Sequence, residues 1–264
     1  MNKLHTALAQ CKIVPVVVVN DVNHAAPLAR ALQDGGLTVV EVTLRTPAAL
    51  EVISTMRAAC PELVIGAGTI LNDDNIRAAR DAGAEFGVSP GTSPSLLKAI
   101  VESGWSFIPG CATPSEALTL ADAGFKVVKL FPAEVVGGLN MIKSLASPLP
   151  HIQFMPTGGV RLEKVADYVA QPNVVALGGT WIAPADKLAN NDFVGINIEI
   201  LYGAANPESE RAGLAESPLW DDQRQCWFWI DIPKRRIHRH SDAEHRVWQL
   251  PQRDAFDPGA IALS

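Results

Sequence analysis

The sequence predicts an α/β fold over residues 1–195, in which a parallel sheet closes as a (β/α)8 TIM barrel. Two observations carry this prediction. Short runs of Val, Ile and Leu alternate with segments of helical periodicity, and parallel strands that are buried on both faces have this near-continuous apolar character. Eight such strand–helix units follow one another at intervals of roughly 20–25 residues, which is the spacing of βα units in a barrel.

The predicted strands share a β-branched, apolar composition and occupy, in order, Ile13–Val19, Thr38–Thr43, Leu63–Ala67, Ala84–Val88, Trp105–Pro109, Lys126–Leu130, Ile152–Met155 and Val174–Leu177. Several of the helices between them start at side chains that cap helix N-termini, namely Asn72, Ser93 and Thr113. No element is predicted before Ile13, and the residues that precede it are treated as a leader. An open doubly wound sheet is the alternative architecture, which is disfavoured because no GxGxxG motif follows the first strand.

The composition is that of a globular protein with a large core, since 48% of the 264 residues are hydrophobic and 19% are charged. The net charge of -6 argues against a general nucleic-acid or anionic-membrane binder, although a small anionic ligand needs only a local positive site. There is no signal segment and no apolar run of about 18 residues, so a cytoplasmic location is expected. The four cysteines lack the paired spacing of a zinc or redox site, and we interpret them as reduced thiols.

The carboxyl ends of the predicted strands bring together the residues that can carry chemistry. In a barrel of this kind the active site lies at that end, because the loops that follow the strands meet at one mouth. One carboxylate, one arginine, one lysine and two Gly-Gly turns converge there. With their neighbours, the residues concerned are Glu41, Arg45, Thr69, Pro90, Lys129, Phe131, Thr157, Gly158, Gly159, Gly179 and Thr180.

Lys129 lies among apolar neighbours in the segment KVVKLFPAE, in which Pro132 ends the strand. Burial disfavours the charged ammonium of a lysine, and a neutral amine can attack a ketone to form a Schiff base. The alternative is a lysine that extends past the strand end to reach solvent or a carboxylate. The strand taken alone leaves both interpretations open.

Two further features of the mouth also have a structural alternative. Glu41 and Arg45 lie on one face of their strand, so they could form a structural ion pair. The glycine pairs could be no more than tight turns. Glycines that follow strands 7 and 8 of a barrel are, however, where backbone N–H groups commonly bind phosphate. Their position therefore favours a phosphate site.

These residues fall within an ordered set of motifs that resembles the 2-keto-3-deoxy-6-phosphogluconate (KDPG) and 4-hydroxy-2-oxoglutarate (KHG) aldolase family over residues 1–195. The motifs are VVEVTLRT (Val39–Thr46), IGAGTIL (Ile65–Leu71), GVSPG (Gly87–Gly91), IPGCATPSE (Ile108–Glu116), VVKLFPAE (Val127–Glu134), PTGGV (Pro156–Val160) and LGGTW (Leu177–Trp181). The resemblance implies a class I aldolase, which is a lyase that forms a Schiff base with its substrate.

By this resemblance Lys129 is the Schiff-base lysine, and Glu41 is the general acid/base that acts through a water on carbinolamine formation and on the C4 hydroxyl. Arg45 and Thr69 match the groups that hold the pyruvate carboxylate. Thr180 stands where the family usually has a serine, and it keeps the hydroxyl. The rest of the expected substrate-binding set lines the same pocket or forms the phosphate-binding turns, and comprises Pro90, Phe131, Thr157, Gly158, Gly159 and Gly179.

The implied reaction cleaves KDPG to pyruvate and glyceraldehyde 3-phosphate in the Entner–Doudoroff route of sugar-acid catabolism. Cleavage of 4-hydroxy-2-oxoglutarate to pyruvate and glyoxylate is implied as a second reaction. The resemblance implies no metal and no organic cofactor, a small phosphorylated keto acid as the partner, no nucleic acid or membrane, and a homotrimer. Two alternatives stay open: the same chemistry on the epimer 2-keto-3-deoxy-6-phosphogalactonate, and an inactive fusion that acts as an oligomerising scaffold.

The resemblance to the aldolases fades after Phe193, and an altered eighth helix is the most that residues 193–206 are expected to form. Beyond them the sequence alternates with period two, which predicts antiparallel strands at Cys226–Ile230 and Arg236–His240. From about Ile198 to the end of the chain it resembles the first blade of the gluconolactonase/regucalcin propellers. We therefore expect residues 196–264 to be a truncated, propeller-blade-like all-β fragment with no activity of its own.

Overall fold

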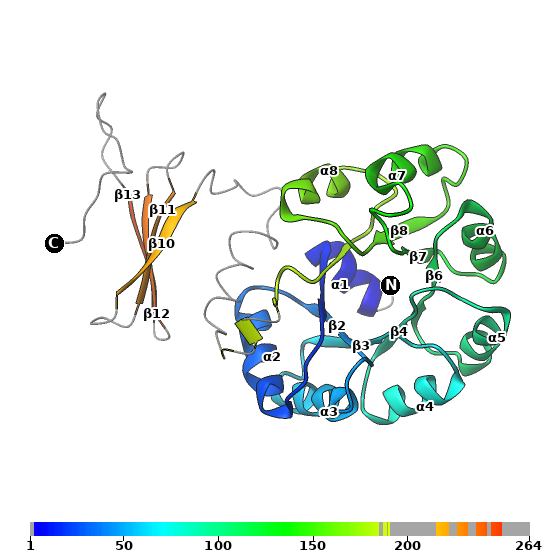
Figure 1. Ribbon diagram of the computed structural model, residues 1–264, viewed down its shortest axis with the longest axis horizontal. Helices are drawn as coiled ribbons and strands as arrows, with labels where there is room; N and C mark the ends of the chain where they lie inside the picture. The colour runs from blue at the N-terminus through cyan, green and yellow to red at the C-terminus, as the bar shows by residue number, and fades with distance from the viewer. Residues whose placement is uncertain are drawn as a thin grey trace. The chain divides into compact units, whose positions relative to one another are not determined.

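The structure is a computed structural model that describes residues 3–184, 187, 188 and 190, and four strands between residues 215 and 249. The chain divides into two compact units, Met1–Pro207 and Glu208–Ser264. In the first unit a ring of strands is enclosed by helices that lie outside it (Figure 1). None of the helices described is both long and apolar enough to cross a lipid bilayer.

The ring consists of parallel strands, and each predicted strand of the first unit overlaps an observed one. Hydrogen bonds order them β5-β4-β3-β2-β1-β9 in one sheet and β6-β7-β8 in another. The strands are β1 (Ile13–Val17), β2 (Val39–Thr43), β3 (Val64–Gly68), β4 (Phe86–Val88), β5 (Phe107–Ile108), β6 (Gly110–Cys111), β7 (Val127–Leu130), β8 (Gln153–Pro156) and β9 (Leu177–Gly179).

Two junctions join these sheets into one curled sheet of the TIM-barrel type. Only Pro109 separates β5 from β6, and its carbonyl accepts a hydrogen bond from the N–H of Lys129 at 2.9 Å. Proline has no N–H to give to the ladder, which explains why the strand is interrupted at this residue. On the other side, a parallel bridge joins Thr157 to Gly178, and β9 in turn pairs with β1. The predicted α/β barrel is confirmed at this level.

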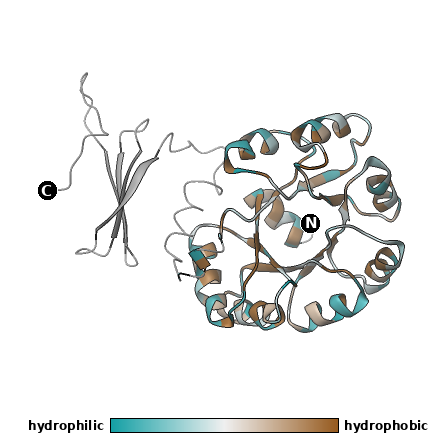
Figure 2. Ribbon diagram, in the orientation of Figure 1, coloured by the Kyte–Doolittle hydropathy of each residue, from teal (hydrophilic) through white to brown (hydrophobic). Residues whose placement is uncertain are grey.

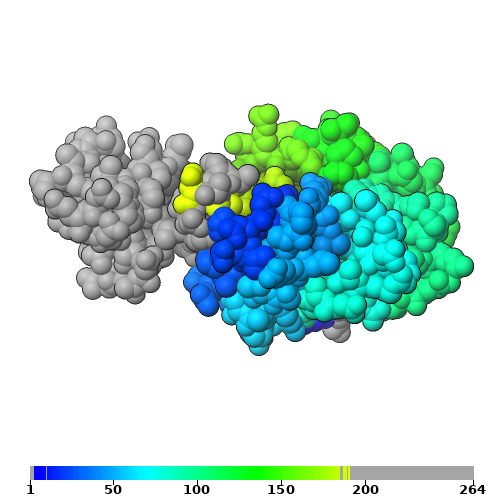
Figure 3. Space-filling view, turned by 60° about the horizontal axis from the view of Figure 1, so that its bottom comes forward, coloured from blue at the N-terminus to red at the C-terminus, as the bar shows by residue number. Residues whose placement is uncertain are grey.

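The helices outside the ring begin where the sequence places capping residues. The side chains of Asn72, Ser93 and Thr113 accept hydrogen bonds from backbone N–H groups in the first turn of their helices, as predicted. Successive helices such as α2 to α5 lie side by side, so the colours change in chain order around the outer surface (Figure 3). The helices are α2 (Ala25–Asp34), α3 (Ala49–Ala59), α4 (Asp73–Asp81), α5 (Pro94–Ser103), α6 (Pro114–Asp122), α7 (Gly138–Ala146) and α8 (Val165–Val169), with the 3-10 turns η1 (Val22–His24) and η2 (Leu162–Lys164).

The core lies between the sheet and these helices. All residues of β1, β2 and β3 are buried, as expected for parallel strands that are covered on both faces. In α2, Leu28 and Leu32 are four residues apart on one face and are completely buried. Figure 2 shows the same division, with brown on the strands and teal on the outward sides of the helices. Burial of the apolar faces thus holds the strands in position, and the position of the strands determines where their carboxyl ends meet.

The first helix, α1 (Lys3–Cys11), corrects the prediction of a leader before Ile13. Leu4, Ala7 and Leu8 are buried, and α1 contacts β1, β2 and β3. Lys3 pairs with Glu85 just before β4 at 2.7 Å, so the helix covers the amino ends of the strands. It closes the end of the barrel that lies opposite the predicted mouth.

The second unit contains a four-stranded antiparallel sheet in the order β10-β11-β12-β13. β11 (Cys226–Asp231) and β12 (Arg236–Ser241) confirm the two predicted strands, and β10 (Ala215–Asp221) and β13 (Glu244–Gln249) extend them. Antiparallel meanders of this kind occur in many all-β proteins, so the predicted propeller relationship gains no support from it. The predicted domain boundary at residues 195–196 and the altered eighth helix lie outside the described residues.

Candidate active site

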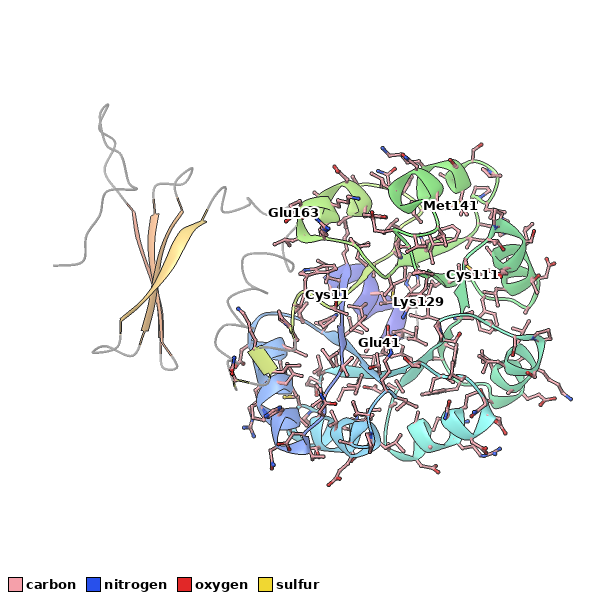
Figure 4. The ribbon with its side chains drawn as sticks, viewed as in Figure 1. Cys11, Glu41, Cys111, Lys129, Met141 and Glu163 are labelled. Carbon is pink, nitrogen blue, oxygen red and sulfur yellow. The ribbon has the colours of Figure 1, made fainter. Side chains whose placement is uncertain are left out.

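Lys129 and Glu41 form an ion pair inside the ring of strands. Lys129 lies in β7 and Glu41 in β2, and Figure 4 shows the two side chains near one another within the ring. The Lys129 Nζ donates to the Glu41 Oε1 at 3.0 Å and to the Oε2 at 3.3 Å. Glu41 is 1% exposed and Lys129 is 3% exposed. A nucleophilic amine and a carboxylate that can exchange protons with it therefore share one water-poor space.

One glycine on a neighbouring strand makes room for this pair. It is not Gly66 or Gly110, which pair with Glu41 and Lys129 in the sheet, because a Cβ added to either would meet Phe86 or the Ser89–Pro90 backbone instead. Gly68, at the end of β3, borders the carboxylate directly, because a Cβ added to it would lie 2.1 Å from the Glu41 Oε1. Glycine is therefore required at this position by the space that the carboxylate occupies.

The tight contact at Gly68 leads to a prediction for the variant Gly68→Ala. We expect the turnover of any reaction that uses this pair to fall by about 100-fold, because displacing a reacting group by about 1 Å can cost that much. The buried Glu41 carboxylate must move away from Lys129 to admit the methyl group. Steady-state kinetics measure the effect, with Gly91→Ala as the control, because a Cβ added at Gly91 meets no atom within 4 Å. If Gly68→Ala and Gly91→Ala have equal kcat values, the reaction does not require the Glu41 carboxylate to lie where it is observed.

Phe131 lies close to Lys129, and Thr157 lies at the end of the neighbouring strand β8; that the three line one pocket stays a prediction. The Phe131 ring centroid lies 5.4 Å from the Lys129 Nζ, within the range of a cation–π contact. Thr157 is buried at the end of β8, and its hydroxyl donates to the Met155 carbonyl at 3.3 Å. A Cβ on Gly178 would lie 2.2 Å from the Thr157 Oγ1, so β9 packs closely against this side chain.

Arg45 and Thr69 lie together at the ends of β2 and β3. The Arg45 Nε donates to the Thr69 Oγ1 at 3.0 Å, while the arginine side chain is exposed. The structural ion pair of Arg45 with Glu41 is not formed, since Glu41 bonds Lys129 instead. Thr69 has a φ of 60°, a left-handed conformation that is uncommon for a residue other than glycine. Strained conformations of this kind gather at functional sites, and this one aims the threonine hydroxyl at the arginine.

Pro90 lies between Ser89 and Thr92, whose hydroxyls form a ring of hydrogen bonds with Gly110, the residue after the strand break at Pro109. The Gly110 N–H donates to the Ser89 Oγ at 3.0 Å, and the Thr92 hydroxyl donates to the Gly110 carbonyl at 2.9 Å. Because the Thr92 proton is used in this way, the 3.2 Å contact between the two hydroxyls has Ser89 as donor. The ring fixes the residues on either side of Pro90, yet the sequence analysis assigned no role to Ser89 or Thr92.

The predicted phosphate-binding glycines lie at two adjacent strand ends. Gly158 and Gly159 have φ values of 98° and 77°, a conformation that glycine adopts without steric cost. Gly179 ends β9, and Thr180 follows it at the surface. The bridge between Thr157 and Gly178 holds the two turns beside one another. Successive backbone N–H groups in such turns can form an anion-binding concavity.

A cluster formed by Glu134, Tyr168 and Lys164 was missed in the sequence analysis. The Tyr168 hydroxyl donates to the Glu134 Oε1 at 2.6 Å, and the Lys164 Nζ donates to the Oε2 at 2.5 Å. The hydrogen bonds from Lys164 and then Tyr168 hold the pKa of Glu134 below its ordinary value of 4.5. Burial, and then the hydrogen bond to Glu134, raises the pKa of Tyr168. The contribution of Glu134 to stability is thus present above pH 4.5 and is lost as the pH falls through the lowered pKa.

The cysteines do not offer a competing nucleophile in the described part of the chain. Cys11, Cys60 and Cys111 are free and buried, which agrees with the interpretation as reduced thiols. Burial, followed by the charge of Glu116, raises the pKa of Cys111 to about 12, although this residue lies in β6 beside β7. Its thiol is therefore protonated and weakly nucleophilic at neutral pH. Within the described residues, no group of three or more histidine, cysteine, aspartate and glutamate side chains is placed to hold a metal ion.

Comparisons with known proteins converge on the first unit. The family described as KDPG and KHG aldolase matches residues 4–198. A 2-dehydro-3-deoxy-phosphogluconate aldolase from Treponema pallidum is 42% identical over 193 residues, which cover 73% of this chain and 92% of that protein. A KHG/KDPG aldolase from Escherichia coli is 42% identical over 181 residues, which cover 69% of this chain and 85% of that protein.

Solved structures give the same result. A KDPG aldolase from Legionella pneumophila is described with pyruvate captured at low pH as a covalent carbinolamine intermediate. It matches this chain with a TM-score of 0.74 and 34% identity, and the match covers 77% of this chain and 98% of that one. The match to the family ends before β10, so it concerns the barrel and not the second sheet.

Proposed function

This chain belongs to the KDPG and KHG aldolase family and is a lyase, and from that premise we propose that Lys129 is its Schiff-base nucleophile and Glu41 its general acid/base. The substrate is KDPG, which the enzyme cleaves to pyruvate and glyceraldehyde 3-phosphate. The observation that carries the residue assignment is the buried contact of 3.0 Å between the Lys129 Nζ and the Glu41 carboxylate. It supplies an amine, and a base for its proton, in one enclosed position.

The reaction begins when Glu41 takes a proton from Lys129 and leaves a neutral amine. The Nζ attacks the C2 ketone of the substrate and forms a C–N bond as the C=O π bond opens, and transfer of a proton from the nitrogen to the alkoxide oxygen gives a carbinolamine. Glu41 then returns a proton to the departing hydroxyl, directly or through a water, so that water leaves and an iminium ion forms. The positive iminium nitrogen is the electron sink for the next step.

Cleavage follows from the same two residues. Glu41 accepts the proton of the C4 hydroxyl, the C3–C4 bond breaks, and its electron pair moves toward the iminium nitrogen to give an enamine. Glyceraldehyde 3-phosphate leaves as the aldehyde. The enamine takes that proton back from Glu41 at C3, which restores the carboxylate, and hydrolysis of the resulting iminium consumes one water, releases pyruvate and restores the Lys129 amine.

The ends of the substrate are assigned to different groups of the mouth. Arg45, held by Thr69, receives the C1 carboxylate through a charge-assisted contact. Pro90, Phe131 and Thr157 line the space around the keto acid. The terminal phosphate takes its hydrogen bonds from the glycine turns, which comprise Gly158, Gly159, Gly179 and Thr180.

The same site accounts for a second substrate. 4-Hydroxy-2-oxoglutarate presents the same ketone and C4 hydroxyl to Lys129 and Glu41 but lacks the phosphate, so we propose a weaker cleavage to pyruvate and glyoxylate. The galactonate-derived epimer of KDPG stays an alternative substrate, because it carries the same reacting groups. From the family relationship we expect the protein to form a homotrimer and to act in the cytoplasm. The gluconolactonase-like assignment of the tail stays a hypothesis and adds no activity to the proposal.

The proposed nucleophile is tested by trapping. Incubation of the full chain with pyruvate and borohydride should reduce the imine to a stable secondary amine. We expect one pyruvyl adduct in the intact mass and its location on Lys129 by peptide mapping. A folded protein that gives no adduct, or an adduct on another residue, would overturn the proposal and would bring forward the inactive scaffold.

A further inference from the structure

We propose that Glu134 is a positioning residue that holds the Gly158–Gly159 turn in place for the phosphorylated end of the substrate. The inference rests on the proposed function, in which this turn binds phosphate. It concerns the Glu134 cluster, defined as Glu134, Tyr168 and Lys164. The proposed chemical steps are assigned to none of these three residues.

The backbone of the loop after β7 holds the start of the turn. The Ala133 N–H donates to the Thr157 carbonyl at 2.7 Å, and the Glu134 N–H donates to the Gly158 carbonyl at 3.1 Å. The contact is close as well as polar, because a Cβ added to Gly159 would lie 3.0 Å from the Cβ of Glu134. A shift of Glu134 would therefore move both glycines of the turn.

The side chain of Glu134 holds the segment that follows the turn. Lys164 ends η2, only a few residues after Gly159, and Tyr168 follows it in α8. Both donate to the Glu134 carboxylate, one to each oxygen, so the carboxylate joins this segment back to the loop after β7. Glu134 thus holds the turn through its backbone N–H and the segment after the turn through its carboxylate.

The environment of the cluster makes its geometry rigid. Tyr168 is completely buried, so its hydroxyl is fixed by packing as well as by the hydrogen bond. Gly138 leaves the space that the cluster fills, since a Cβ there would lie 3.1 Å from the Tyr168 hydroxyl and 3.2 Å from the Glu134 Oε1. Hydrogen bonds with an ionised partner are shorter and stronger than neutral ones, and Glu134 accepts two. A preorganised turn loses less freedom when it binds an anion, so its position sets phosphate affinity.

Kinetics with two substrates test this inference in the full chain. In Glu134→Gln we expect the KM for KDPG to rise about tenfold, because the amide cannot pair with Lys164 as a carboxylate does. The kcat for KDPG and both constants for the phosphate-free 4-hydroxy-2-oxoglutarate should stay within twofold of the parent values. Tyr168→Phe removes only the second donor and should raise the KM for KDPG in the same direction, by a smaller factor.

The chain offers a matched control in Glu85. Its side chain has the same 22% exposure as that of Glu134 and also accepts from two cations, Lys3 and Arg57, each at 2.7 Å. It lies before β4, at the opposite end of the barrel from the turn. Glu85→Gln should therefore leave the KM for both substrates unchanged. If Glu134→Gln raises the KM equally for the two substrates, or if Glu85→Gln has a similar effect, Glu134 only stabilises the fold in general. Either result would overturn the inference.

A measurement that needs no catalysis separates this inference from the proposed function. Hydrogen–deuterium exchange of peptides that contain Ala133 and Glu134, whose N–H groups donate to the turn, should be faster in Glu134→Gln than in the parent protein and in Glu85→Gln. Unchanged exchange in this segment would overturn the positioning role even if pyruvate is trapped on Lys129. Faster exchange in a protein that traps no pyruvate would instead uphold the structural role of Glu134 and overturn the proposed nucleophile.

Discussion

Replacement of Lys129 by methionine is expected to abolish pyruvate trapping and to lower kcat/KM for KDPG cleavage by about a million-fold, the scale seen when a covalent enzyme loses its nucleophile. Methionine fills a similar space but has no amine that could form the imine. Pyruvate release and intact mass after borohydride reduction measure the two effects. Lys126→Met is the control, since Lys126 immediately precedes β7 and is exposed.

The same variant removes one partner of a buried ion pair. The Glu41 carboxylate would keep its buried position without a cation, which typically costs about 3–5 kcal/mol of stability. The double variant Glu41→Gln/Lys129→Met removes the uncompensated charge and should recover part of that loss in urea unfolding. If a folded Lys129→Met protein still cleaves KDPG at the parent rate, Lys129 is not the nucleophile, whatever the stability of the variant.

The barrel was predictable because its strands are defined by local sequence. Residues of β1, β2 and β3 are buried without exception, and that burial on both faces appears in the sequence as continuous apolar runs. Asn72, Ser93 and Thr113 cap their helices through bonds within three residues. Such signals need no knowledge of distant contacts. The break at Pro109 is itself a local effect of proline, but the Ser89 and Thr92 hydroxyls that bridge it could not be recognised in the same way, because they come from another strand end.

The members of the candidate site were predictable for a related reason. Parallel strands end on one side of a barrel, so Glu41 and Lys129 had to face the same mouth once their strands were assigned. Their direct contact was not predictable, since it joins residues that are 88 positions apart. Sequence alone also left Glu41 and Arg45 as a plausible pair, and only the position of Lys129 across the barrel resolves that choice.

The features that the sequence analysis missed depend on packing between distant segments. α1 packs on β1, β2 and β3, and its buried face is explained by the strand ends that it covers. Glu134 and Tyr168 are ordinary residues of a loop and a helix, and 34 positions separate them. A glutamate in a motif gives no sign that its carboxylate joins two segments. Only the three-dimensional structure shows that its backbone holds the Gly158–Gly159 turn while its side chain holds the segment after that turn.

The variant Glu41→Gln is expected to lower kcat for KDPG cleavage by about 100- to 10,000-fold, the range that general acid–base catalysis contributes. Glutamine keeps the length of the side chain, and its amide oxygen can still accept a hydrogen bond from Lys129, so the fold should be largely retained. It cannot take a proton from the lysine or from the C4 hydroxyl. Steady-state kinetics and the rate of borohydride-dependent adduct formation with pyruvate measure these losses separately.

Adduct formation distinguishes the two proposed catalytic residues. Lys129→Met removes the atom that becomes bonded to pyruvate, so no adduct can form at any time. Glu41→Gln keeps that atom and removes only the proton carrier, so the same adduct should form on Lys129, but more slowly. If trapping is as fast as in the parent while cleavage is slow, Glu41 acts on the C4 hydroxyl and a different group serves carbinolamine formation. Parent rates in both assays would exclude Glu41 as the general acid/base, because no step would then depend on its carboxylate.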